Sequence, residues 1–177
     1  MNYHNITYPD MNNGDGLRVV LWLSGCSHRC YNCQNPQTWD VNSGIPFDES
    51  AKEELFRELD KDYISGLTLS GGDPLHEANL DGVLDLVNEI RLSFPNKSIW
   101  LYSGYQWEQL FNDGVYLTKE CAGWKRKEIV KQCTVMVDGK YIDSQRNPSK
   151  KWAGSDNQMV IDILESLKQN KVILYCD

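Results

Sequence analysis

The segment "RVVLWLSGCSHRCYNCQNP", from Arg18 to Pro36, joins an apolar run to a dense group of cysteines. Its first part, Arg18–Ser24, is almost continuously apolar, which is typical of a strand that a parallel sheet buries on both faces. Cys26, Cys30 and Cys33 follow with the spacing C-x3-C-x2-C. Parallel α/β folds place their chemistry at the carboxyl ends of their strands. The segment therefore predicts a parallel sheet with a cysteine-rich site at the end of its first strand.

The rest of the chain alternates between strand and helix patterns. Further strands are predicted over Gly66–Gly72, Ser98–Gly104, Cys133–Gly139 and Lys171–Tyr175. Helices are predicted over Asp48–Lys61, with Asp48 as N-cap, and over Asn79–Phe94, Tyr105–Asn112 and Ser155–Gln169, whereas Cys121–Lys131 is ambiguous. Such alternation implies right-handed β-α-β crossovers. A closed barrel of this kind needs about 250 residues. We therefore expect an α/β fold that forms an open, partial (β/α) barrel with a mainly parallel sheet of about five strands.

The composition is that of an acidic globular domain. The chain has 177 residues and a net charge of −7, which fits a single domain over residues 1–177. Because this charge repels phosphate backbones, nucleic acid is not expected as a partner. No apolar run reaches the ~18 residues of a membrane span, and the N-terminus lacks the pattern of a secretory signal. We therefore expect a cytoplasmic protein with reduced thiols and no membrane partner.

Three closely spaced cysteines leave two kinds of metal site open. A structural zinc site uses four protein ligands, and His28 between Cys26 and Cys30 would strain a tetrahedral arrangement. A [4Fe–4S] cluster bound by three thiolates leaves one iron free to bind a substrate. The spacing favours the iron–sulfur cluster over zinc, and zinc over incidental cysteines. The other three cysteines share no ligand spacing and are interpreted as structural or incidental: Cys121, Cys133 and Cys176.

A second motif, Gly71–Pro74 ("GGDP"), directly follows the second predicted strand. Together with the cysteine motif it resembles the radical S-adenosylmethionine (SAM) superfamily. The resemblance is closest to the glycyl-radical activases of anaerobic ribonucleoside-triphosphate reductases. It rests on six segments in order: "NGDGLRVVLWLSGC", "CQNPQTWD", "LTLSGGDPL", "IWLYSGY", "VMVDGKY" and "GSDNQ". These segments extend from Asn13 to Gln158 and imply a partial barrel of the radical SAM type.

The resemblance implies roles for individual residues. Cys26, Cys30 and Cys33 would be the catalytic cluster ligands, and the amino and carboxylate groups of SAM would chelate the open iron. SAM binding is implied for residues in five segments: Asn32, Gly71, Gly72, Asp73, Ser103, Asp138, Asn157 and Gln158. The glycine motif would hold the methionyl amino group, and Ser103 and Asp138 would lie near the carboxylate. Asn157 and Gln158 would lie near the nucleotide. Asn32 takes the position of a superfamily aromatic residue; here the aromatic residue, Tyr31, comes one place earlier.

The resemblance also implies a reaction and its partners. A flavodoxin or ferredoxin would reduce the cluster, SAM would be cleaved to a 5′-deoxyadenosyl radical, and this radical would take a hydrogen atom from a glycine of the reductase large subunit. Docking candidates are the loop residues Gly123–Glu128 and Asn147–Trp152. Two alternatives stay open: a short radical SAM enzyme acting on a small molecule, as in deazapurine synthesis, and a non-enzymatic zinc-binding interaction module.

Overall fold

The structure is a computed structural model that describes residues 1–111 and 121–176. It contains one seven-stranded sheet in the order β3-β1-β2-β4-β5-β6-β7. The strands are β1 (Asn2–Asp10), β2 (Arg18–Leu23), β3 (Ile45–Pro46), β4 (Gly66–Gly71), β5 (Ser98–Tyr102), β6 (Val135–Asp138) and β7 (Met159–Asp162). The four central strands, β2, β4, β5 and β6, are parallel. Antiparallel pairs flank them, because β1 pairs with β2 and β3, and β7 pairs with β6.

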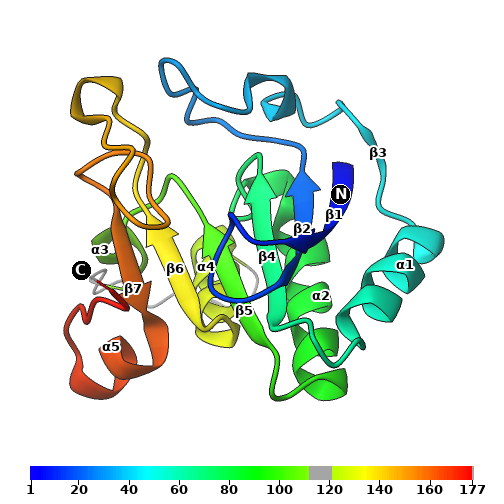
Figure 1. Ribbon diagram of the computed structural model, residues 1–177. Helices are drawn as coiled ribbons and strands as arrows, with labels where there is room; N and C mark the ends of the chain where they lie inside the picture. The colour runs from blue at the N-terminus through cyan, green and yellow to red at the C-terminus, as the bar shows by residue number, and fades with distance from the viewer. Residues whose placement is uncertain (112–120, 177) are drawn as a thin grey trace.

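Helices cover one face of this sheet. They are α1 (Glu49–Leu59), α2 (Leu80–Ser93), α3 (Trp107–Phe111), α4 (Ala122–Gln132) and α5 (Ile163–Gln169), with short 3₁₀ turns at Pro36–Thr38, Glu77–Asn79 and Asp143–Gln145. Val19, Leu21 and Leu23 of β2 belong to the main core cluster together with apolar residues of α1, α2 and α4. Side chains alternate along a strand, so Arg18, Val20 and Trp22 face the opposite side. Figure 1 shows α2 and α4 behind the sheet and loops on its other side.

Most predicted elements are confirmed. The four buried strands form as expected, and they are the four parallel ones. Asp48 caps α1, since its Oδ1 accepts a hydrogen bond from Ala51 N at 3.0 Å. The ambiguous segment Cys121–Lys131 forms α4, whose first turn is capped by Cys121 Sγ. The predicted helix Tyr105–Asn112 begins two residues late, at Trp107, and Asn112 lies outside the described residues.

Two predictions near the C-terminus are wrong. The segment Lys171–Tyr175 is not a strand and contributes only an isolated bridge between Leu174 and Ile161. The predicted helix Ser155–Gln169 is helical only from Ile163, because Met159–Asp162 extends the sheet as β7 beside β6. The apolar residues of β7 complete the edge of the core. Asp162 then caps α5, because its Oδ1 accepts a hydrogen bond from Glu165 N at 3.0 Å. None of the helices in residues 1–111 and 121–176 is long and apolar enough to span a membrane.

A buried arginine closes the amino-terminal end of the open face. The Arg18 side chain is fully buried, and its guanidinium group lies 5.4 Å from the centre of the Trp100 ring. It donates to Thr68 Oγ1, to the hydroxyl and carbonyl of Ser98, and to the carbonyls of Asp15 and Leu67. All five donors of the group are therefore satisfied by neutral acceptors. Burial lowers the pKa of Arg18 to about 10, so the group stays charged at neutral pH.

Replacing Arg18 by alanine should strongly destabilise the fold. The change leaves a cavity and unpaired buried carbonyls, so we expect the free energy of unfolding to fall by about 3–5 kcal/mol. Urea unfolding followed by circular dichroism measures this. The matched control is Arg57→Ala, because the Arg57 side chain is 64% exposed and such changes cost at most about 0.5 kcal/mol. Equal stabilities of the two variants would contradict the structural role of Arg18.

Candidate functional site

The cysteine loop leaves the carboxyl end of β2 and is closed at its base. Gly25 N donates to Thr38 O at 2.7 Å, and Cys26 N donates to Trp39 O at 3.0 Å. Within the loop, Cys33 N donates to Cys30 O at 3.1 Å. Cys26, Cys30 and Cys33 are all free thiols and all half-buried. The loop therefore presents three thiols from one short, closed segment at the predicted end of the sheet.

The donor set suits an iron–sulfur cluster. Thiolates are the usual ligands of such clusters. Burial raises the pKa of Cys26 to about 11 and also raises that of Cys30, so both are thiols until a metal binds. Within the described ranges, no three His, Cys, Asp or Glu side chains are placed to share a single metal ion. This finding includes Cys26, Cys30 and Cys33, so the family comparison below, and not the geometry, separates an iron–sulfur cluster from zinc.

The glycine motif packs directly against the start of the cysteine loop. Gly72 N donates to Leu23 O at 2.7 Å, and Asp73 N donates to Gly25 O at 2.8 Å. Gly71 has a φ of +95°, and a Cβ atom there would lie 2.8 Å from Leu23 N. A Cβ atom on Gly72 would lie 2.6 Å from Gly25 O. Both glycines are therefore required so that the two loops can touch, in addition to any contact with a ligand.

Asp73 is the buried centre of this region. Its side chain accepts hydrogen bonds from Leu75 N at 2.8 Å, Ser103 Oγ at 2.9 Å and Gly104 N at 3.0 Å. His28 Nε2 lies 2.7 Å from its Oδ2 atom. The carboxylate thus joins three segments: the glycine motif, the loop after β5 and the cysteine loop. Of the predicted SAM residues, the structure brings Asp73 and Ser103 into direct contact.

Asp138 ends β6 and is also buried. Its Oδ1 accepts from Met159 N at 3.0 Å and its Oδ2 accepts from Trp107 N at 2.9 Å. Burial is the largest effect on this carboxyl group and raises its pKa. Asp138 therefore ties β6 to α3 and β7.

Asn157 and Gln158 hold the loop over residues 139–154. Asn157 Nδ2 donates to Lys140 O at 2.8 Å, and Gln158 Nε2 donates to Gly139 O at 2.9 Å. Gln158 Oε1 also accepts from Gly154 N at 2.9 Å. In Figure 1 this loop and the cysteine loop rise from the same end of the sheet. The two predicted residues therefore organise the wall opposite the cysteines.

A pocket of about 380 Å³ lies at this end of the sheet. Its floor consists of strand residues from the open face: Trp22, Ser70, Tyr102 and Val137. Its walls come from loops: Asn12, Asn13, Cys33, Gln34, Asn35, Tyr141, Lys150, Trp152, Ala153, Gly154 and Gln158. The volume lies within the roughly 300–1,000 Å³ of small-molecule sites. The pocket extends from a cysteine of the loop to the opposite wall.

Only two predicted site residues, Cys33 and Gln158, line this pocket, and Asn32 is exposed with a φ of 54°. The floor residues Trp22, Ser70 and Tyr102 were not among the site residues predicted from the sequence. The alternation of side chains along the predicted strands could have identified them, because every second residue of a strand faces the same side of the sheet. Lys150, predicted only as part of the docking candidate Asn147–Trp152, is held at the wall by donating to the carbonyls of Asp156 and Gln158.

The two docking candidates differ in structure. Gly123–Glu128 lies in helix α4, so the expectation of a loop there is wrong. The start of the long loop that was expected over Val115–Lys131, residues 115–120, lies outside the described residues. Within that helix, Arg126 donates to Leu75 O at 2.9 Å and its guanidinium group lies 4.6 Å from the centre of the Tyr105 ring. Asn147–Trp152 does lie in the loop after β6, beside the pocket.

Comparison with known proteins decides the family. The model of the 4Fe-4S single cluster domain family matches residues 12–161. Three relatives carry the name anaerobic ribonucleoside-triphosphate reductase-activating protein. The protein of Escherichia coli K12 is 39% identical, and the match covers 90% of this chain and 97% of the Escherichia coli protein. The protein of Enterobacteria phage T4 is 42% identical, and the match covers 89% of this chain and 92% of the phage protein. The protein of Vibrio cholerae serotype O1 is 37% identical, and the match covers 90% of this chain and 97% of the Vibrio protein. The chain belongs to this family of activating proteins.

Membership in the activating-protein family confirms the resemblance seen in the sequence. The match to the 4Fe-4S single cluster domain starts at Asn12 and ends at Ile161, within β7. It therefore includes the cysteine loop, the glycine motif and every residue that lines the 380 Å³ pocket.

Proposed function

We propose that this protein activates an anaerobic ribonucleoside-triphosphate reductase by creating a glycyl radical on its large subunit. The observation that carries this proposal is the cysteine loop, which is held against the glycine motif beside a pocket of SAM-like size. When bound at Cys26, Cys30 and Cys33 and reduced by a flavodoxin or ferredoxin, a [4Fe–4S] cluster supplies the electron that splits SAM into methionine and a 5′-deoxyadenosyl radical, which takes a hydrogen atom from glycine. The protein is proposed to be a single cytoplasmic domain.

The side chains of the site support binding and orientation. Among the polar groups that line the pocket, the hydroxyls of Ser70 and Tyr102 and the ammonium group of Lys150 are suited to bind a ribose or carboxylate. The apolar surfaces of Trp22 and Trp152 shield the pocket from water. We propose that SAM lies here, with its methionyl end toward Cys33.

The predicted SAM residues are proposed to act in two ways. The Asp73 and Asp138 carboxylates and the Ser103 hydroxyl are already hydrogen-bonded within the protein, so they hold the shape of the site. Backbone atoms of Gly71 and Gly72 are proposed to contact SAM directly, whereas the Gln158 side chain, already bonded to Gly139 O and Gly154 N, holds the pocket wall that it lines. Asn157 supports the wall through Lys140, and the exposed Asn32 is proposed to contact SAM only at the edge of the cluster.

The open architecture fits a protein substrate. The parallel strands form part of a (β/α) barrel of the radical SAM type in this proposal, and the sheet ends on one side at β7 without closing. A large partner can supply the missing wall by inserting a glycine-bearing loop toward SAM. Asn147–Trp152, at the margin of the pocket, is the segment proposed to contact that partner.

The proposed function is tested by electron paramagnetic resonance. The cluster-loaded protein, SAM, a low-potential electron donor and the reductase are mixed without oxygen. We expect a doublet signal, split by the remaining α-hydrogen of the glycine. Reductase with deuterated glycine should transfer deuterium to 5′-deoxyadenosine. If SAM is consumed but neither the doublet nor the label appears, a small-molecule radical SAM enzyme becomes the better assignment.

A further inference from the structure

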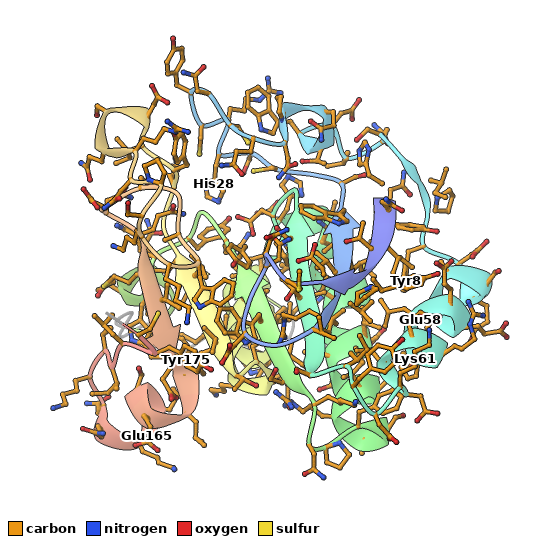
Figure 2. The ribbon with its side chains drawn as sticks, viewed as in Figure 1. Tyr8, His28, Glu58, Lys61, Glu165 and Tyr175 are labelled. Atoms are coloured by element: carbon orange, nitrogen blue, oxygen red, sulfur yellow. The ribbon has the colours of Figure 1, made fainter. Side chains whose placement is uncertain are left out.

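The side chain of His28 points from the cysteine loop back toward the sheet (Figure 2). It comes from the stretch between Cys26 and Cys30, yet it is only 10% exposed. Its Nε2 atom is enclosed by protein and makes no aligned hydrogen bond; it faces Asp73 Oδ2 at 2.7 Å. A polar atom buried in this way, between two proposed cluster ligands, requires an explanation.

The imidazole is held on its other sides as well. The Tyr105 ring meets it edge to face, with centroids 4.9 Å apart and planes at 78°. A Cβ atom on Gly104 would lie 2.3 Å from His28 Cδ2, so only glycine leaves room for the ring there. The guanidinium group of Arg126 in α4 also lies over the Tyr105 ring, 4.6 Å from its centre. Contacts from the loop after β5 therefore press the His28 ring against Asp73.

Resting on the proposed function, we propose that His28 is a positioning residue that sets the cysteine loop relative to the SAM-binding glycine motif. The base of the loop is fixed by Gly25 and Cys26, but a base alone leaves the middle of a loop free to tilt. The His28–Asp73 contact fixes that middle. Because Asp73 is part of the glycine motif, one contact couples the place of the cluster to the place of the methionyl group. Mutation of residues that orient metal ligands typically costs about 10–100-fold in affinity or activity.

The test uses His28→Ala and His28→Gln, the second of which keeps a side-chain N–H donor. In the metal-free protein, amide hydrogen exchange of residues 26–33 should become faster in His28→Ala and return toward the wild-type rate in His28→Gln. After cluster loading, His28→Ala should retain about four irons per chain but bind SAM about tenfold more weakly. The change that SAM causes in the electron paramagnetic resonance spectrum of the reduced cluster should shrink or become heterogeneous, and His28→Gln should restore it in part.

Two further variants sharpen the result. Gly104→Ala should reproduce the effects of His28→Ala, because its methyl group displaces the ring without removing it. His4→Ala is the control, since His4 lies on β1 and its ring contacts Ser43 Oγ at 2.9 Å, and neither Asp73 nor a residue between Cys26 and Cys33 is its partner. Unchanged exchange in residues 26–33 of the metal-free His28→Ala protein would overturn the inference. If the wild-type chain fails to bind a cluster or cleave SAM, the proposed function fails, while the exchange experiment still decides whether His28 anchors the loop.

Discussion

Cys30→Ala is expected to abolish SAM cleavage. Cys30 lies in the middle of the closed loop, half-buried, with Cys33 N bonded to its carbonyl. Alanine keeps the backbone but removes a thiolate, so the cluster is lost or bound with the wrong iron exposed. The rate should fall by more than about 100-fold, the upper end of the loss when groups that merely support metal ligands are removed. Iron analysis and the rate of 5′-deoxyadenosine formation without oxygen measure the two parts of this effect.

The matched control is Cys176→Ala. Cys176 is also a half-buried free thiol, but it packs against the cluster of apolar residues around Trp100 and lies far from the loop in sequence. This variant should keep about four irons per chain and a rate within about twofold of the wild type. Full activity in Cys30→Ala, or equal iron loss in both variants, would remove the three-cysteine loop from the proposed site.

Gly72→Val should disrupt the junction between the two loops. The new Cβ atom would start 2.6 Å from Gly25 O, a backbone atom that cannot move without shifting Cys26. Because the bond from Asp73 N to Gly25 O must also lengthen, we expect a loss of stability of about 3 kcal/mol. A misplacement of about 1 Å at the reacting groups can lower the cleavage rate about 100-fold. Thermal unfolding and single-turnover cleavage of SAM measure these effects.

Gly82→Ala provides the comparison for a glycine elsewhere. Gly82 lies within α2, and a methyl group there would meet only the flexible side chain of Met1. Alanine favours a helix over glycine by roughly 0.5–1 kcal/mol, so this variant should be as stable as the wild type or more so. If Gly72→Val were as stable as Gly82→Ala and cleaved SAM at the same rate, the close approach of the two loops would not be needed for stability or for cleavage.

The parallel core was predictable because its strands are continuous apolar runs. Arg18–Leu23 and Gly66–Gly71 are buried on both faces, and glycines or cysteines mark where each ends. The edges were not predictable in the same way. Strand β1 is largely polar and becomes a strand by pairing with β2, and Met159–Asp162 is short enough to fit either a helix or a strand. Pairing partners decide such segments, and a local pattern does not contain them.

The site was predictable by position along the chain but not by contact. The motifs correctly indicated which segments meet at the end of the sheet, since Asp73 and Ser103 touch. They could not show that the Asp73 carboxylate is engaged by Ser103, Gly104 and His28, because those contacts join residues 30 or more positions apart. His28 itself was considered only as a zinc ligand. Its burial depends on a gap left by Gly104, which no spacing within the cysteine loop reveals.

The backbone bonds at the base of the cysteine loop allow the chain to fold independently of iron binding. In a zinc finger the metal must also order the chain, so much of its binding free energy is spent on folding. Here the bonds from Gly25 to Thr38 and from Cys26 to Trp39 join the loop ends through backbone atoms and use no cysteine thiol, and a buried apolar core lies beneath them. Folding of the backbone can therefore supply the free energy that closes the loop. We therefore expect iron to enter after the chain has folded, and a chain that oxygen has stripped of iron to stay folded and to bind iron again.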